Sequence, residues 1–152
     1  MESLLSAPAL ELFLHQQIPL SQAMQVTAVE VTEDAVLLSA PLAPNLNHRA
    51  TVFGGSACAV AMLSAWALLH VRLRVALPSV AIVIQRQSMN YQRPIHGAFA
   101  ARAQLAQPAE WPRFLRLLAR RGRARITVAA TLDYCGNAAG YFSGAFVTFV
   151  QP

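Results

Sequence analysis

The stretch that decides the fold is residues 53–77, FGGSACAVAMLSAWALLHVRLRVAL. Gly54 and Gly55 open it, and nearly every residue from Ser56 to Val71 is apolar. A helix that is apolar almost all round must be covered on most sides by other elements. We therefore predict one long central helix over about 54–76, with the rest of the chain wrapped around it. The start of such a helix leaves backbone amides and the positive end of its dipole free.

The flanking sequence predicts strands that return on one another as hairpins. Segments rich in Val, Ile, Phe and Ala, several of them alternating with polar residues, are separated by short turn sequences such as Glu33-Asp34 and Gly136-Asn137. Ser6 and Pro8 are typical of the start of a short N-terminal helix. The predicted strands are 25–32, 35–40, 80–91, 99–105, 123–133 and 138–150, with a short surface helix or turn over 111–121. We predict a single α+β domain, residues 1–152, with an antiparallel sheet of about six strands.

Composition limits the class of protein. Hydrophobic residues make up 55% of the chain and charged residues 12%, which excludes a disordered protein and favours a surface partly covered by another subunit. The net charge is +5, and all twelve basic residues are arginine, a side chain suited to phosphate groups. No basic face with aromatic platforms is evident, so we expect no nucleic-acid partner.

Three further expectations concern metals, membranes and location. The two cysteines and four histidines have no ligand spacing, so no metal site is predicted. The long apolar stretch could span a membrane by length, but Gly-Gly, Ser64 and His70 interrupt it, so we expect no membrane partner. The chain starts without a basic and apolar leader, which favours the cytoplasm.

Polar residues gather in the sequence just before the helix and at the end of one strand. Asn45, Asn47, His48 and Thr51 precede Phe53, and the strand over 80–91 turns polar towards Tyr91 and Arg93. The Gly55 amide, together with that of Gly54 or Ser56, is placed to stabilise a developing oxyanion. The alternative is that the two glycines only allow close packing of helix against sheet.

Local motifs resemble a known family. The run Asn47-His48-Arg49-Ala50-Thr51-Val52-Phe53-Gly54-Gly55-Ser56 is similar to the helix start of the YiiD C-terminal thioesterase family, with Ala50 where glycine is expected. Asn90-Tyr91-Gln92-Arg93-Pro94 resembles the Tyr-x-Arg-Pro strand end of hot-dog thioesterases. The resemblance implies a hot-dog fold, a homodimer or dimer of dimers, and an acyl thioester substrate, with coenzyme A only as part of that substrate. We predict that the substrate-binding residues are Asn45, Thr51, Phe53, Gly54, Ser56, Tyr91 and Arg93.

The general base is the open question. Related thioesterases with His-Gly-Gly carry a carboxylate about two turns into the helix, whereas Phe53 replaces that histidine here and the helix position is near Met62. No Asp or Glu occurs between Ala35 and Ala109. His48 is then the best candidate base, because an unperturbed imidazole titrates near ~6.5, with Asn47 organising the water. The alternative for His48 is a residue that caps the loop.

Two functions follow as hypotheses. The first is an acyl-CoA or acyl-carrier-protein thioester hydrolase in which Gly55, His48 and Asn47 carry catalysis. The second is a non-catalytic module that binds the same acyl thioesters, which the missing carboxylate keeps open. A dehydratase is disfavoured, since it needs a His and carboxylate pair.

Overall fold

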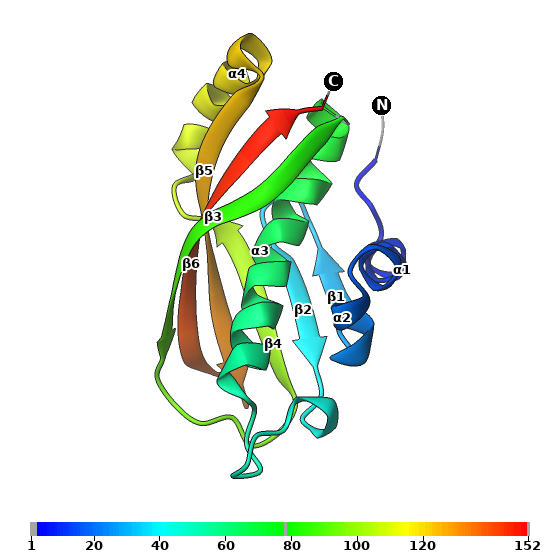
Figure 1. Ribbon diagram of the computed structural model, residues 1–152, viewed down its shortest axis with the longest axis vertical. Helices are drawn as coiled ribbons and strands as arrows, with labels where there is room; N and C mark the ends of the chain where they lie inside the picture. The colour runs from blue at the N-terminus through cyan, green and yellow to red at the C-terminus, as the bar shows by residue number, and fades with distance from the viewer. Residues whose placement is uncertain (1–2, 78, 152) are drawn as a thin grey trace.

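The computed structural model describes residues 3–77 and 79–151 (Figure 1). Met1 and Glu2, part of the argument on a leader, lie outside the described residues. The helices are α1 Ala7–Gln17, α2 Pro19–Ala23, α3 Gly54–Ala76 and α4 Trp111–Arg121, with 3-10 turns η1 Ala43–Asn45 and η2 Pro108–Glu110. The strands are β1 Thr27–Val31, β2 Val36–Ala40, β3 Val80–Tyr91, β4 Phe99–Leu105, β5 Arg123–Tyr134 and β6 Asn137–Val150.

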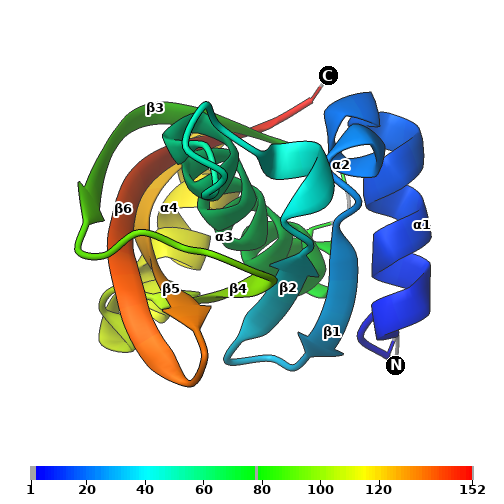
Figure 2. The same ribbon diagram turned by 90° about the horizontal axis from the view of Figure 1, so that it is seen from below.

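One curved sheet wraps around α3, as predicted. The six strands run in the order β1-β2-β4-β5-β6-β3, and each neighbouring pair is antiparallel. Figure 2 shows the strands as an arc around α3, with α1 outside β1 at one end of the arc and β3 at the other. The predicted single long helix and short N-terminal helix are both confirmed.

Burial explains why α3 sits inside this arc. Small residues recur every fourth position at Ala57, Ala61 and Ala65, which lets the sheet approach the helix closely. Buried Ser64 bonds the Ala61 carbonyl at 2.7 Å, so its hydroxyl is satisfied within the helix. In the described ranges α3 is the one helix long and apolar enough to cross a membrane, and 61% of that stretch is buried inside the protein. These features are typical of a core helix.

The edge strand β1 is covered by α1. Ser6 caps α1 by accepting from the Ala9 amide at 3.2 Å. Glu11 accepts a hydrogen bond from the Ala28 amide at 2.9 Å, and His15 Nε2 lies 2.8 Å from the Val26 carbonyl oxygen. The Val26 carbonyl and the Ala28 amide, at this end of the sheet, therefore have side-chain partners.

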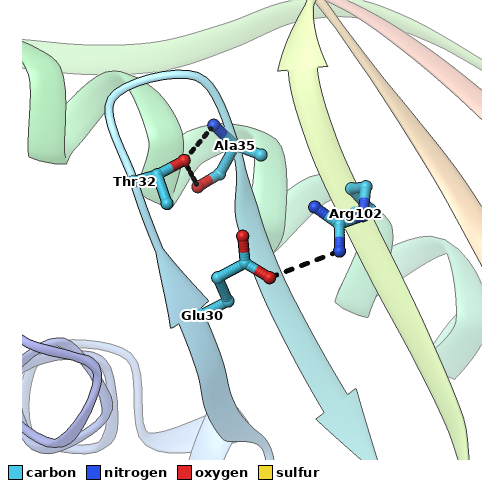
Figure 3. A network of polar contacts seen from close by, with 4 residues as sticks. All are labelled: Glu30, Thr32, Ala35 and Arg102. Carbon is cyan, nitrogen blue, oxygen red and sulfur yellow. Dashed lines mark hydrogen bonds and ion pairs between the residues drawn. The ribbon is translucent and has the colours of Figure 1, made fainter.

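The β1–β2 hairpin closes where the sequence predicts it, around Glu33-Asp34. Thr32 Oγ1 accepts from the Ala35 amide at 3.0 Å and donates to the Ala35 carbonyl at 3.2 Å (Figure 3). In the same view Glu30 pairs with Arg102 of β4 at 3.4 Å. Both side chains of this pair are well exposed, so we assign it at most about 1 kcal/mol.

Two turns show where backbone conformation departs from expectation. The predicted Gly136-Asn137 turn is wrong by one residue, because Cys135 and Gly136 both have positive φ, 51° and 77°, and Asn137 already pairs in β6. Two consecutive positive φ values are what a tight hairpin turn requires. Ala50, where the family resemblance favours glycine, has φ of 60°. The glycine-like conformation is thus kept at Ala50 despite its side chain.

The predicted surface helix is α4. Phe114 and Leu118 bury its apolar face, and Gly122 ends it with φ of 70°. The Arg72 guanidinium of α3 lies 4.2 Å from the centroid of the Trp111 ring. This cation–π contact joins α4 to the far end of α3.

Candidate functional site

The start of α3 offers free backbone donors. Phe53 provides no side-chain cap. Within α3, Ala57 is the first residue whose amide has a backbone partner, the Phe53 carbonyl at 3.0 Å. The amides of Gly54, Gly55 and Ser56 have no backbone partner in the described part of the chain. Together with the helix dipole they form a place where negative charge is stabilised.

Gly55 lies at the edge of an apolar cavity of about 380 Å³. One face of α3 forms its wall, and residues of the α2 region and of β3 and β6 form the sides. Among the described residues no Asp, Glu or His lines it. The lining residues are Ile18, Leu20, Met24, Gly55, Cys58, Ala59, Met62, Leu63, Trp66, Ile84 and Phe146. A cavity of this size and lining suits an apolar ligand group.

A second hollow, about 260 Å³, lies beside Gly54. Tyr91, Arg93 and Pro94 line it together with residues of the helix start and of β6. The structure therefore brings Gly54, Tyr91 and Arg93 together, as the sequence predicted for substrate-binding residues. The first turn of α3 contributes to both hollows.

A β-bulge aims two polar side chains of β3 at the helix. The pairing of β3 with β6 shifts between Ile84 and Arg86. Beyond the shift, Gln87 and Tyr91 pair with Gly144 and Gly140, which are buried on the inner face of the sheet. A bulge adds one residue to a strand and so reverses which side chains face inward.

These two side chains contact α3. The Cys58 thiol donates to Gln87 Oε1 at 3.5 Å, and the Tyr91 hydroxyl donates to the Gly54 carbonyl at 2.8 Å. Burial raises the pKa of Cys58, although a hydrogen bond with Tyr91 opposes the shift. Burial and the neighbouring Cys58 raise the pKa of Tyr91. Both groups stay protonated at neutral pH, so Cys58 is not an activated thiolate.

Asn47 shapes the loop before the helix. Its Nδ2 donates to Thr51 Oγ1 at 2.7 Å and to the Val52 carbonyl at 3.3 Å. Its Oδ1 accepts from the amides of Arg49 at 2.8 Å and Thr51 at 3.1 Å. A side-chain amide has two donors and two acceptor positions, so Asn47 has no free capacity for a catalytic water. Thr51 Oγ1 accepts this one hydrogen bond from Asn47, so its O–H donor and its second acceptor position remain for the predicted substrate contact.

His48 lies at the exposed tip of this loop. Within residues 3–77 and 79–151 it makes no hydrogen bond and no ion pair, and it lines neither hollow. A general base must lie within hydrogen-bond reach of the proton that it removes. The described contacts of His48 do not place its ring beside either hollow. Its catalytic role stays a prediction.

Two other predicted residues hold the backbone. Asn45 is 1% exposed, and its Nδ2 donates to the carbonyls of Met24 and Pro41 at 3.0 and 2.8 Å. Arg93 donates through Nε and Nη2 to the Ala138 carbonyl at 3.2 and 2.9 Å. The Asn45 amide thus joins the loop to α2, and the Arg93 guanidinium fixes the start of β6.

Phe53 covers Gly55. A Cβ atom built on Gly55 would lie 2.3 Å from the Phe53 ring, whose residue is 56% exposed. Glycine at position 55 lets the ring lie against the backbone. Ser56, beside it, is half-buried and makes no side-chain hydrogen bond in the described residues.

Sequence reasoning missed Cys58, Gln87 and the apolar lining of the cavity as site residues. The polar end of the strand over 80–91 was the available signal, but only the bulge decides which of its side chains face the helix. In the described part of the chain no three His, Cys, Asp or Glu side chains gather as a metal site would require.

A six-stranded antiparallel sheet around one central helix, with free amides at the helix start beside an apolar cavity, defines a hot-dog protein. The profile described as "Putative thioesterase (yiiD_Cterm)" matches residues 7–150, and the chain belongs to that family.

Solved structures show the same fold. A protein of unknown function from Chlorobaculum tepidum has a TM-score of 0.89 at 24% identity, with 95% of this chain and 94% of that one covered. A candidate thioesterase from Shewanella oneidensis gives 0.82 at 26% identity, covering 95% and 97%. A thioesterase from Haemophilus influenzae gives 0.78 at 11% identity, covering 97% and 93%.

Proposed function

We propose that this protein hydrolyses acyl thioesters of coenzyme A or of an acyl carrier protein. The observation that carries the proposal is the position of Gly55, whose amide belongs to the free helix start and whose residue lines the apolar cavity. A thioester has an apolar acyl chain on one side of its carbonyl and a polar carrier arm on the other. The apolar cavity at Gly55 matches the acyl chain, and the hollow at Gly54, lined by Tyr91 and Arg93, matches the carrier arm.

The reaction follows from this placement. The acyl chain occupies the apolar cavity, and the carbonyl oxygen accepts from the Gly55 amide, which stabilises the negative charge as water adds to the carbonyl carbon. The carbon–sulfur bond then breaks, and the thiolate leaves with the electron pair and takes up a proton. A thiol of pKa roughly 8.5 is a good leaving group, so little acid assistance is needed. The carrier arm lies in the hollow beside Tyr91 and Arg93.

The second candidate, a binding module for the same acyl groups, is favoured by one observation. Met62 lines the cavity where related thioesterases carry a carboxylate, and no acidic side chain is among the lining residues. Without a base, water attack at the bound carbonyl loses about 10²–10⁴-fold in rate. His48 is the remaining candidate for that role.

Steady-state hydrolysis of an acyl-CoA series by wild type and His48→Ala tests the proposal. We expect turnover by wild type and a fall of about 10²-fold in kcat for the variant, with unchanged thermal unfolding. His15→Ala, which removes a histidine that lines neither hollow, is the control for assay losses. No turnover of any acyl-CoA or acyl-carrier-protein thioester, with ligand-induced thermal stabilisation retained, would replace the hydrolase by the binding module. Full activity of His48→Ala would remove only the assignment of the base.

We also propose that the protein forms a homodimer through β3, alone or as a dimer of dimers. β3 has 12 residues and ends the sheet, with Val83 48% exposed. In the described ranges the Trp66 indole is the only side chain hydrogen-bonded to the backbone of β3. The other edge strand, β1, is covered by α1. A long free edge strand is an aggregation hazard unless it is paired.

The molar mass in solution checks this proposal. We expect two or four times the 16.4 kDa chain mass by light scattering on a size-exclusion column. A mass of one chain at micromolar concentration would contradict it.

A further inference from the structure

We propose that Trp66 closes the far end of the apolar cavity and sets the longest straight acyl chain that the site accepts. This inference rests on the proposed function for the identity of the ligand, an unbranched acyl group. It adds a residue that determines chain length and an expected limit of roughly ten to twelve carbons.

The cavity follows one face of α3. The helix residues that line it are spaced as i, i+3, i+4, i+7, i+8 and i+11: Gly55, Cys58, Ala59, Met62, Leu63 and Trp66. Eleven residues of helix rise about 16 Å, and a helical side chain leans back towards the N-terminus. An extended hydrocarbon advances about 1.25 Å per carbon, since bonds of about 1.5 Å meet near 111°. A chain whose carbonyl is at Gly55 therefore reaches Trp66 after roughly ten to twelve carbons.

Trp66 is held on two sides. Its Nε1–H donates to the Ile82 carbonyl of β3 at 3.0 Å. Its ring stacks on His70, with centroids 5.1 Å apart and planes 9° apart, and His70 stacks in turn on Phe13 of α1 at 4.3 Å. A side chain fixed by both a hydrogen bond and a stack cannot easily swing aside for a longer ligand.

The stack is uncharged at neutral pH. Burial, and secondarily the charge of Arg74, lower the pKa of His70 to about 4. The neutral imidazole is therefore a flat, largely apolar support for Trp66. The indole is the last large side chain of the helix strip, whereas Met62 and Leu63 are flexible or branched aliphatic groups along its sides.

Hydrolysis of straight-chain acyl-CoAs of about six to sixteen carbons tests the role of Trp66. We expect wild type to lose activity beyond roughly twelve carbons. Trp66→Ala frees space for roughly four methylene groups, so its preference shifts by about that number and its relative activity on longer chains rises tenfold or more. Trp111→Phe, on α4 and outside the cavity, is the matched control and keeps the wild-type profile. An unchanged profile in folded Trp66→Ala overturns the inference.

A binding measurement separates this inference from the hydrolase proposal and does not require Trp66→Ala to fold. Trp111→Phe leaves Trp66 as the only tryptophan, because the chain has two. Fatty acids that carry bromine at the terminal carbon quench indole fluorescence on contact. We expect quenching at saturation to be weak for short chains and strongest near roughly twelve carbons. If quenching depends on chain length but no acyl thioester is hydrolysed, the hydrolase proposal is overturned and Trp66 is kept as the end of the cavity. Equal quenching at all lengths, or no binding of any acid, would overturn the inference.

Discussion

Replacing Gly55 by proline is expected to lower the turnover of acyl thioesters about 10²–10³-fold, the usual effect of removing one oxyanion donor. Proline has no backbone N–H, and its fixed φ is compatible with the first turn of a helix. The Gly55 amide has no backbone partner in the described ranges, so proline costs α3 no hydrogen bond. The change therefore acts on the donor and leaves the helix in place.

Gly55→Ala is the matched control for this experiment. Both variants add a Cβ, which would lie 2.3 Å from the Phe53 ring and forces that exposed ring to rotate, but only alanine keeps the N–H. Repeating the pair in a Phe53→Ala background removes the steric conflict. Comparable kcat values for the proline and alanine variants in that background, with similar unfolding temperatures, would show that the Gly55 amide does not stabilise the transition state.

The framework of the fold could be predicted because it depends on local patterns. Gly-Gly followed by an apolar run indicated α3, and the apolar run that follows it indicated β3 with its observed bounds, Val80–Tyr91. The hairpin around Glu33-Asp34 was predicted from two short Val-rich segments that flank turn residues. In each case the residues that determine the element lie within it or next to it.

The site depends on contacts that no local pattern reveals. Gln87 meets Cys58 across 29 positions of sequence, and only because a bulge shifts the register of β3 on β6. Asn47 could be identified as important, yet its role is to hold the loop, because its four hydrogen bonds are all made to neighbours within five residues. The sequence indicates which polar groups are present, whereas the fold decides which of them remain free.

Replacing Met62 by glutamate in a His48→Ala background is expected to raise kcat about 10²–10⁴-fold over that background, the range that a positioned general base contributes. Met62 lines the cavity seven residues beyond Gly55, which is two helical turns along the same face. A carboxylate there would be placed to take a proton from water that attacks a carbonyl held at Gly55. Met62→Gln, nearly the same size and without a basic oxygen, is the matched control.

The pH dependence makes this experiment specific. An apolar cavity disfavours a charged carboxylate, so we expect the pKa of the introduced glutamate side chain to lie above the usual ~4.3. Because the base acts when deprotonated, the gain should be absent at acid pH and rise to a plateau as pH passes that raised pKa. If Met62→Glu is no faster than Met62→Gln at any pH, the cavity does not present a thioester carbonyl to this face of α3. If the gain appears in a protein that is nearly inactive as wild type, the oxyanion end of the helix is intact and the lack of a base alone accounts for the inactivity.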